Sequence, residues 1–415
     1  MNDPLPGTSP HARMAGENIV CFAKDWTEDP TSNNHVMRML ARRNRVLWLN
    51  SISMRAPALG NRGDLGKIRR KIAQYAGGPK RVKDDLHVFT PLVLPFPHNR
   101  MAIAANRRIL KADINRHRRR FDMEDFQLWA FLPNSVEYFG MLGEQLRVYY
   151  CTDEFSQFSY MDGKAMVEKE RRLMEQADIV FTTSRSLLEA KRPFNRETHL
   201  ASHGVDHAHF ATALEGDAPV APDLAGLRGP IIGFFGFIHD WIDIDLVAHV
   251  ARRRPDWNIV MIGRVETDIA RATGLPNVHW IGRRTYESLP AYCRGFSVGI
   301  IPFRINELTR HVNPIKLREY LSAGLPVVST ALPEVELCGD WCSVAHDPEE
   351  FIALCEQAIL ADSPEARRAR SAAMQDEDWE HQIARIEANV MRVKRARHAT
   401  THEAAAVPAP EPTHP

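Results

Sequence analysis

The chain has 415 residues, of which 44% are hydrophobic and 25% are charged, and its formal net charge is +1. Compact domains usually hold ~100–200 residues, so this length predicts two or three domains of ordinary globular composition. The near-zero net charge gives no overall basic excess that would indicate nucleic-acid binding.

The cysteines and apolar runs indicate a reducing, cytoplasmic location. A spanning helix needs ~18 consecutive apolar residues, and no run reaches that length. The N-terminus lacks the apolar core of a signal peptide. The cysteines are scattered, lie mostly inside apolar runs and complete no zinc site, which predicts structural roles. They are Cys21, Cys151, Cys293, Cys338, Cys342 and Cys355.

Strand-like and helix-like segments alternate through the first half of the chain. Residues 1–16 are polar with three prolines, so we expect a disordered leader before an N-terminal domain at 17–212. Expected strands are Ile19–Ala23, Arg45–Asn50, Leu86–Thr90, Phe126–Phe131, Leu146–Tyr150 and Ile179–Thr183, and the clearest helices are Asn33–Arg43 and Lys164–Gln176. This alternation predicts a parallel sheet that is covered on both faces.

A second strand–helix series follows a segment at 213–228 that is rich in Ala, Pro, Gly and Asp and is therefore a predicted linker. Expected strands are Ile231–Phe235, Asn258–Ile262, Val278–Ile281, Val298–Ile301 and Val327–Ser329, with helices near 243–253, 286–293, 314–323 and 349–361. We assign 229–375 to a C-terminal domain, 376–397 to a helix that packs back on the first domain and 398–415 to a disordered tail. The fold class is α/β, with two Rossmann-like doubly wound domains facing across a ligand-binding cleft.

The most informative segment runs from residue 313 to residue 330. Pro314 suits the first position of a helix, and Gly324 suits the residue after its end. Lys316 and Glu319 are three residues apart and so share a helix face. The helix N-terminus offers free N–H groups and a positive dipole, which suit a diphosphate together with the Lys316 ammonium. The Glu319 carboxylate suits the paired hydroxyls of a ribose.

This segment resembles the C-domain motif of nucleotide-sugar glycosyltransferases of the GT-B fold, of the group 1 kind. The resemblance implies that Lys316 binds the donor phosphates and Glu319 the donor ribose, with a nucleotide-diphosphate sugar as substrate and with no cofactor or metal. The alternative is a Lys–Glu pair on the surface of an amphipathic helix.

Further donor-binding candidates lie at the ends of the predicted C-domain strands. Gly236 allows a close approach of the backbone to a ligand, although a tight turn explains it equally well. Arg264 and Arg283 could pair with phosphates, or they are solvated strand ends. The complete predicted set is Gly236, Arg264, Gly282, Arg283, His311, Asn313, Pro314, Ile315, Lys316 and Glu319.

Catalytic and acceptor-binding candidates lie in the first half of the chain. A polar loop joins the first strand to the first helix, and its Asn33 and Asn34 are predicted to bind the acceptor. His35 is a catalytic candidate, with helix capping or packing as the alternative. Asp153 follows a strand and is the preferred general base, with Glu154 second. The alternative for Asp153 is a helix N-cap.

Two departures from the retaining relatives favour inversion of the sugar configuration. Those relatives carry a second glutamate eight residues before Glu319, where this chain has His311, and they carry an Arg and a Lys that are missing from the loop 237–241. The first ~50 residues instead resemble the xanthan glucuronosyltransferase family, which inverts with an N-domain aspartate as base. That resemblance again implies Asp153 as the base.

Residues 62–120 are strongly cationic with interleaved apolar residues, which favours binding to an anionic membrane surface. The alternative is a solvated face, and no aromatic platform for nucleic acid accompanies the charge. The cations are Lys67, Arg69, Arg70, Lys71, Lys80, Arg81, Lys83, Arg107, Arg108, Lys111, Arg116, Arg118, Arg119 and Arg120.

Together these features predict a metal-independent hexosyl- or glycuronosyltransferase that builds cell-surface or exopolysaccharide. Its acceptor is a saccharide or a polyprenyl-linked sugar, and its location is cytoplasmic or peripheral on the inner face of the membrane. A nucleotide-sugar epimerase of the same fold and a non-catalytic nucleotide-sugar-binding module are the alternatives.

Overall fold

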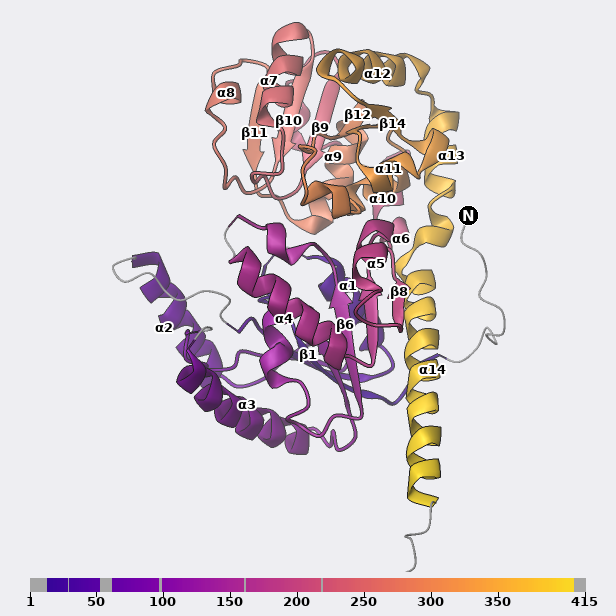
Figure 1. The fold of residues 1–415 in the computed structure, drawn as a ribbon. Coiled ribbons are helices and arrows are strands. Elements are labelled where there is room, and N and C mark those ends of the chain that lie inside the picture. Colours follow the sequence, from indigo (N-terminus) through magenta and orange to yellow (C-terminus); the bar gives the residue numbers. More distant parts are fainter. Residues whose placement is uncertain are drawn as a thin grey trace, which may run out of the picture. The chain divides into compact units, whose positions relative to one another are not determined.

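The chain folds into two compact units in this computed structural model, which describes residues 13–28, 30–52, 62–96, 99–159, 162–217 and 219–406. Unit 1 takes the chain up to Thr182, together with Lys191–Ala201 and the residues from Ile383 onward. Unit 2 takes Thr183–Ala190 and Ser202–Gln382. Each unit is built around one sheet (Figure 1).

The sheet of unit 1 has the strand order β3-β4-β2-β1-β5-β6-β7-β8. All neighbours are parallel except β3 and β4, which are antiparallel. The strands are β1 (Asn18–Phe22), β2 (Arg45–Leu49), β3 (Lys80–Lys83), β4 (Leu86–Phe89), β5 (Gln127–Ala130), β6 (Leu146–Cys151), β7 (Ile179–Thr182) and β8 (Thr198–Leu200). The chain order reverses between β1 and β5, which is where doubly wound sheets bind ligands.

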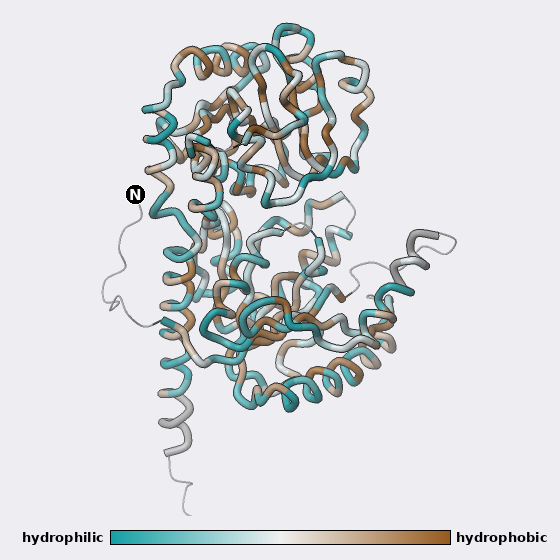
Figure 2. The backbone as a smooth tube through the Cα atoms, turned by 180° about the vertical axis from the view of Figure 1, so that it is seen from behind, coloured by the Kyte–Doolittle hydropathy of each residue, from teal (hydrophilic) through white to brown (hydrophobic). Residues whose placement is uncertain are grey.

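Helices cover the strands of unit 1, which are apolar because both faces of a parallel sheet are buried. Trp129 on β5 stacks on Phe181 of β7 at 6.3 Å, and both side chains are fully buried. Figure 2 shows the two sheets as mainly brown inner strands and the outer helices with teal stretches. The helices are α1 (Ser32–Leu40), α2 (Arg62–Ala76), α3 (Arg100–Arg120), η1 (Pro133–Tyr138), η2 (Phe155–Gln157), α4 (Gly163–Gln176) and the greater part of α14 (Trp379–Ala406).

The sheet of unit 2 is entirely parallel, with the order β11-β10-β9-β12-β13-β14. The strands are β9 (Ile231–Phe235), β10 (Asn258–Ile262), β11 (Val278–Gly282), β12 (Val298–Ile301), β13 (Val327–Thr330) and β14 (Ser343–Ala345). The order reverses between β9 and β12, so their carboxyl ends mark the expected ligand-binding point of this sheet.

Several helices of unit 2 begin with side-chain caps. The Asp243 side chain accepts a hydrogen bond from Leu246 N at the start of α7, and Asp347 caps α12 in the same way. The α-helices are α5 (Arg185–Lys191, which ends in unit 1), α6 (His207–Ala211), α7 (Ile244–Arg253), α8 (Ala270–Thr273), α9 (Leu289–Gly295), α10 (Ile315–Ser322), α11 (Pro333–Glu336), α12 (Pro348–Ala361) and α13 (Pro364–Ala372). The 3-10 helices are η3 (Thr212–Leu214), η4 (Pro222–Leu224), η5 (Tyr286–Ser288), η6 (Thr309–His311), η7 (Gly339–Trp341) and η8 (Gln375–Glu377). Within the described part of the chain, no helix is both long enough and apolar enough to cross a bilayer.

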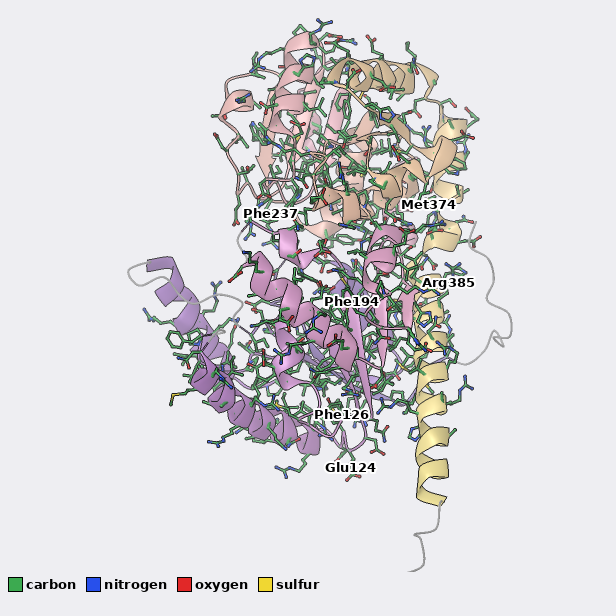
Figure 3. All side chains as sticks on the ribbon, in the orientation of Figure 1. Glu124, Phe126, Phe194, Phe237, Met374 and Arg385 are labelled. Atoms are coloured by element: carbon green, nitrogen blue, oxygen red, sulfur yellow. The ribbon has the colours of Figure 1, made fainter. Side chains whose placement is uncertain are left out.

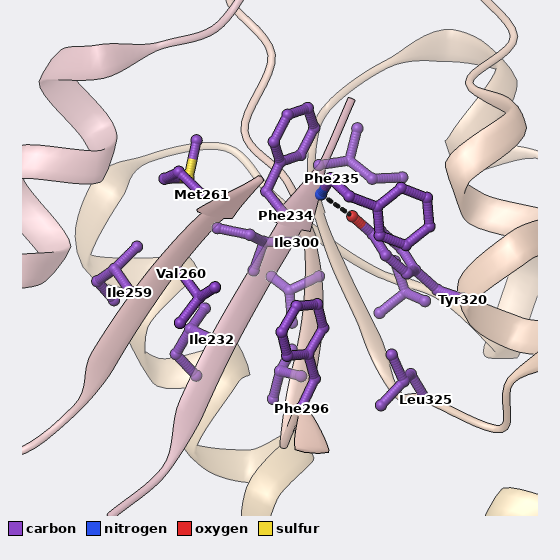
Figure 4. Close-up of a cluster of buried hydrophobic side chains, with 14 of the residues drawn as sticks. Ile232, Phe234, Phe235, Ile259, Val260, Met261, Phe296, Ile300, Tyr320 and Leu325 are labelled. Atoms are coloured by element: carbon purple, nitrogen blue, oxygen red, sulfur yellow. Dashed lines mark hydrogen bonds between the residues drawn. The ribbon is translucent and has the colours of Figure 1, made fainter. Parts of the chain in front are cut away.

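The core of unit 2 fixes α10 against the end of β9 (Figure 4). Tyr320 on α10 is fully buried, and its hydroxyl accepts a hydrogen bond from Phe235 N at 3.1 Å. The Tyr320 ring packs against Gly299 of β12, where a Cβ would lie 2.7–3.0 Å from ring atoms. Because Gly299 has no side chain, α10 can approach β12 closely enough for Tyr320 to form its hydrogen bond with Phe235 N.

The expected strands match the observed strands to within a residue or two, but several predicted boundaries differ. Ala213, Ala221 and Leu224 of the predicted linker are buried in the core of unit 2, because the apolar residues of η3 and η4 pack there. Of the predicted leader, Met14 is buried and Gly16 N donates to Arg43 O. The predicted tail is helical as far as Ala406, because its Ala- and Glu-containing start continues α14. The rest of the leader and tail, residues 1–12 and 407–415, lies outside the described residues.

The residues of α14 from Ile383 onward belong to unit 1 and are held there by ion pairs. Lys394 Nζ lies 2.6 Å from a Glu17 carboxylate oxygen, and Arg392 lies 2.5 Å from Glu197. The segment that the sequence assigns to a returning helix, 376–397, thus consists of η8 and part of α14.

Gly233 in the middle of β9 provides a test of the packing in unit 2. A Cβ at this position would overlap the ring of Phe296, so we expect Gly233→Ala to lower the free energy of unfolding by about 1–3 kcal/mol, the usual effect of overpacking. Urea unfolding measures the change. Gly274→Ala is the matched control, because a Cβ there meets no atom within 4 Å. Equal stabilities of the two variants would contradict this account of the core.

Candidate functional site

The carboxyl edge of the unit 2 sheet is built on three glycines that close β9, β10 and β11. Gly236, Gly263 and Gly282 have φ values of +146°, +148° and +75°, a region that favours glycine. Gly236 N donates to Ile262 O at 2.9 Å, and Gly263 N donates to Gly282 O at 3.0 Å. A Cβ on Gly263 would overlap the carbonyl oxygen of Gly236. The three strand ends therefore lie backbone against backbone, with no side chain between them.

The Lys316 side chain lies directly over this edge. A Cβ on Gly236 would be 2.5 Å from Lys316 Cε and 3.3 Å from its Nζ. The ammonium is also 5.9 Å from the centre of the Phe235 ring. Because Lys316 sits in the first turn of α10, its charge adds to the positive end of the helix dipole. Sequence reasoning predicted Gly236 and Lys316 as site residues separately, and the fold places them in contact.

Glu319 is a buried carboxylate one turn further along α10. Its side chain is buried, and its Oε2 has no hydrogen-bond partner among the described residues. Burial raises the pKa of Glu319, and the charges of Lys316 and His209 partly oppose that rise. An unsatisfied buried carboxylate is costly in a folded protein, so the position suits a ligand that donates hydroxyl hydrogens.

An aromatic pair on α6 and η5 borders Glu319 and was missed by the sequence reasoning. The His209 ring stacks on Tyr286 at 4.7 Å with 16° between the planes, and its Nε2 lies 3.0 Å from Tyr286 O. Phe210 stacks on Phe235 at 6.1 Å. No spacing in the sequence linked His209 to a glutamate 110 positions later.

Other predicted donor residues have structural partners. Asn313 donates from Nδ2 to Thr183 O at 2.9 Å and accepts from Arg318 Nη1 at 2.9 Å, so both ends of its amide are engaged. The carbonyl oxygen of His311 accepts from Ser184 Oγ at 2.7 Å. Pro314 is the N-cap residue of α10, and the helix starts at Ile315. These four residues position the helix that carries Lys316 and Glu319.

The two predicted arginines and the loop after β9 complete this edge. The Arg264 guanidinium lies 4.5 Å from the centre of the Phe237 ring and 3.2 Å from Glu266, while Arg283 is exposed. In the loop 237–241, which lacks the Arg and the Lys of the retaining relatives, the ring of His239 stacks on Trp241 at 4.6 Å. Figure 3 labels Phe237, the neighbour of both rings.

Asp153 lies just after β6 in unit 1. It is partly exposed, and its main-chain oxygen accepts from Cys151 Sγ at 3.4 Å. Burial raises the pKa of the Asp153 carboxyl, against a smaller lowering by a hydrogen bond from Thr152. The N-cap of the following helix η2 is Glu154, so the capping alternative for Asp153 is not what the structure shows. A carboxylate with a raised pKa suits a general base.

Glu154 belongs to a buried ionic network under the same loop. Lys191 Nζ lies 2.6 Å from Glu154 Oε2 and 2.8 Å from Glu170 Oε2, and Tyr149 OH donates to Glu170 Oε1 at 2.6 Å. Burial lowers the pKa of Lys191, but the carboxylates of Glu170 and Glu154 outweigh it and raise the pKa, so the ammonium stays protonated. Because its carboxylate also accepts from Ser156 Oγ, Glu154 holds the loop in place, and we do not retain it as a second base.

The predicted acceptor residues lie at the start of α1, next to the end of β1. Asn34 Oδ1 accepts from Thr31 N at 3.0 Å, so this side chain caps the helix. Asn33 is buried, and its Oδ1 has no hydrogen-bond partner within the described residues. His35 is buried on the same helix. The Asn33 carbonyl oxygen can thus accept a hydrogen bond from a ligand, whereas the Asn34 carbonyl oxygen already accepts one from the backbone of Thr31.

Comparison with known proteins gives this arrangement a family context. Residues 229–360 match the family model of glycosyl transferases group 1. A putative teichuronic acid biosynthesis glycosyltransferase, TuaH of Bacillus subtilis, is 27% identical over 274 residues, which is 61% of this chain and 68% of the relative.

Solved structures with the same fold include the following two proteins. Sucrose-phosphate synthase of Thermosynechococcus elongatus has a TM-score of 0.66 at 14% identity and covers 92% of this chain and 100% of its own. Anabaena Alr3699/HepE in complex with UDP-glucose has a TM-score of 0.56 at 12% identity, with 93% of this chain and 99% of that chain covered.

Two Rossmann-like units with the Lys316–Glu319 helix at the second sheet edge define the class: this is the GT-B fold of nucleotide-sugar glycosyltransferases. The family match narrows the class for the C-terminal part of the chain. Residues 229–360 are similar to the glycosyl transferases of group 1, and the relative TuaH is named for teichuronic acid biosynthesis.

The buried network in unit 1 provides a test of what holds the Asp153 loop. Lys191→Met would leave Glu154 and Glu170 buried without their cation, so we expect the free energy of unfolding to fall by about 3–5 kcal/mol. Urea unfolding of Arg171→Met, which removes two exposed ion pairs on α4, is the control and should show a much smaller fall. A Lys191→Met protein as stable as this control would show that the network does not stabilise the unit.

Proposed function

We propose that the protein transfers a sugar from a nucleoside-diphosphate sugar to a saccharide acceptor during synthesis of a cell-surface polysaccharide. The observation that carries the proposal is the buried Glu319 carboxylate, whose Oε2 has no hydrogen-bond partner among the described residues. It lies one helical turn from Lys316, whose side chain lies over Gly236. The similarity to a protein named for teichuronic acid biosynthesis supports a polysaccharide product, and the fold shared with a UDP-glucose complex supports the donor class.

The donor would bind at the carboxyl edge of the unit 2 sheet. The Glu319 carboxylate would accept hydrogen bonds from the ribose hydroxyls, which would satisfy its free oxygen. The diphosphate would lie against Gly236, where the absence of a Cβ allows close approach, with the Lys316 ammonium beside it. Lys316 and the α10 dipole together would stabilise the charge that develops on the leaving diphosphate, so the proposal includes no metal.

The transfer step would use Asp153 as the general base. The Asp153 carboxylate takes the proton of an acceptor hydroxyl as the hydroxyl oxygen forms a bond to the anomeric carbon. The bond from that carbon to the diphosphate oxygen breaks, and the nucleoside diphosphate leaves with the electron pair. A single displacement of this kind inverts the anomeric configuration. The raised pKa of Asp153 supports the assignment, because a general base is most effective when its pKa lies close to the pH at which the enzyme works.

A ligand screen by thermal unfolding tests the donor class directly. A ligand that binds only the folded state raises the unfolding midpoint, so we expect a nucleoside diphosphate and its sugars to raise it and the corresponding nucleoside to do so much less. No shift with any nucleotide would overturn the proposal. Product analysis separates the activities: isomerised donor without an acceptor would indicate an epimerase, and binding with no turnover would indicate a binding module.

Glu319→Gln should separate stability from donor binding. Burial raises the folded-state pKa of Glu319 above its unfolded value, so the folded protein loses stability as pH rises from the unfolded pKa through the folded pKa. Glutamine removes that loss, and the ligand-free variant should unfold at a higher midpoint than the wild type at pH 7.5. Its nucleotide affinity should fall roughly tenfold to a hundredfold, as expected when hydrogen bonds to a charged acceptor are weakened. Calorimetry measures both.

Glu336→Gln is the control for this variant, since Glu336 is an exposed residue of α11 in the same unit. It should change neither the midpoint nor the affinity. If Glu319→Gln binds nucleotide as tightly as this control, Glu319 does not contact the donor.

Asp153→Asn should lower kcat by roughly 10²–10⁴-fold, the usual contribution of a general base. The base acts only when deprotonated, and burial raises its pKa, so wild-type kcat/KM should fall with decreasing pH at a higher pH than for an ordinary aspartate. The asparagine variant should not show this fall at low pH, and a nucleotide should still raise its thermal unfolding midpoint.

Glu175→Gln, at an exposed position on α4, is the control. Wild-type kcat and an unchanged pH profile in Asp153→Asn would remove Asp153 from the mechanism.

A further inference from the structure

The outward side of α3 carries cations with no acidic balance. The buried residues of α3 define one face of the helix: they are Ala102, Asn106, Leu110, Asp113, Ile114 and His117. By helical periodicity, the opposite face carries Arg100, Arg108, Lys111 and Arg119, all of them exposed or partly so. None of these four has an ion-pair partner among the residues that the structure describes. The single acid of the helix, Asp113, is buried and bound by Tyr75 and Arg116.

Other cations of the predicted basic region have structural roles. Arg107 donates to Glu137 O at 2.6 Å, and Arg116 pairs with Asp113 at 3.1 Å. Arg118 donates to Met123 O and covers the Phe126 ring at 3.6 Å. Within α3, the structure thus separates the cations whose side chains bind other residues of the unit from Arg100, Arg108, Lys111 and Arg119, whose side chains form no hydrogen bond or ion pair with the described residues.

Exposed apolar side chains gather at the N-terminal end of the same helix. The side chain of Asn106 accepts from Leu94 N at 2.7 Å and donates to Leu94 O at 2.9 Å, which ties the preceding loop to α3. Asn99 then caps the helix by accepting from Ala102 N. In this held loop and first turn, Leu94 is 44% exposed, Phe96 51% and Met101 83%. Clustered apolar side chains of this size on a surface indicate an interaction site.

Charge and apolar exposure also coincide on the neighbouring edge strand β3. Lys80 and Lys83 are exposed on it, with Val82 between them at 44% exposure. β3 pairs with β4 on one side, and the sheet ends there. In Figure 3, side chains project outward along the whole of α3.

We propose that this surface docks on an anionic lipid bilayer. We call it the α3 face and define it by Arg100, Arg108, Lys111, Arg119, Phe96 and Met101. Phe96 and Met101 would enter the interfacial region, and the four cations would lie against lipid phosphates, which matches the unbalanced positive charge of the helix. The combination favours lipid over nucleic acid, because the face carries a single aromatic ring, Phe96, and so offers no series of rings on which successive bases could stack. Docking would bring the enzyme to acceptors held in a membrane.

Vesicle sedimentation of the full-length protein tests the proposal without any donor or acceptor, so its outcome is independent of the proposed reaction. We expect binding to vesicles of phosphatidylglycerol and phosphatidylcholine, weaker binding as salt rises, and little binding to phosphatidylcholine alone. Each cation near an anionic leaflet changes the partition coefficient about fivefold. The double variant Arg108→Glu/Lys111→Glu should therefore bind at least about tenfold more weakly.

The chain offers matched controls in the same unit. Arg192→Glu/Arg196→Glu makes the same charge change at two exposed positions outside α3, and should bind as the wild type does, apart from the small effect of net charge. Phe96→Ser should weaken binding, whereas Phe194→Ser, at a residue 42% exposed and labelled in Figure 3, should not. Thermal unfolding confirms that each variant is folded.

The proposal fails if wild-type protein does not sediment with anionic vesicles, or if both charge-reversal variants lose binding equally. Tighter binding to a DNA oligonucleotide than to the vesicles, abolished by Arg108→Glu/Lys111→Glu, would likewise overturn it in favour of a nucleic-acid surface.

Discussion

The candidate donor site depends on one steric constraint, the close approach of bare backbone at the ends of β9 and β10. The Gly263 Cα lies so near the Gly236 carbonyl that no side chain fits between them, and the aliphatic end of Lys316 occupies the space over Gly236. Because Tyr320 bonds to Phe235 N one residue earlier, α10 is locked in the position that brings Lys316 there. A charged side chain, a helix N-terminus and an open stretch of backbone thereby meet at the switch point of the sheet.

The two units deal with buried charge in opposite ways. In unit 1, Lys191 lies between Glu154 and Glu170 and a tyrosine hydroxyl completes the set, so the charges are paired and the loop after β6 is fixed. In unit 2, Glu319 Oε2 finds no hydrogen-bond partner in the described part of the chain, and burial raises the pKa of this carboxyl. A satisfied network serves the fold, whereas an unsatisfied carboxylate is tolerated where a ligand completes it. Glu154 and Glu319 are both at least partly buried, but only Glu319 has an oxygen that the described residues leave for a ligand, so Glu319 is the stronger site candidate.

Helices α10 and α3 show what the spacing of residues in the sequence can predict and what it cannot. The segment at 313–330 predicted a helix start, a helix end and a shared face for Lys316 and Glu319, all of which follow from spacing within one element. The same reasoning grouped Arg107, Arg116 and Arg118 with Arg108 and Lys111, because sequence does not distinguish a cation that donates to a distant carbonyl from one that faces solvent. Asn313 likewise matched a ligand-binding motif, yet its amide joins Thr183 and Arg318.

The sequence by itself determined the strand–helix alternation, the two doubly wound units and the donor motif, because apolar periodicity and helix caps act over a few neighbouring residues. Only the tertiary structure decided which side chains meet. It brought His209 to Glu319 and Gly236 under Lys316, joined Glu154 to Lys191 and packed the predicted linker into the core of unit 2. Those contacts join positions 37 or more residues apart, and they depend on how helices pack on a sheet, which no local spacing encodes.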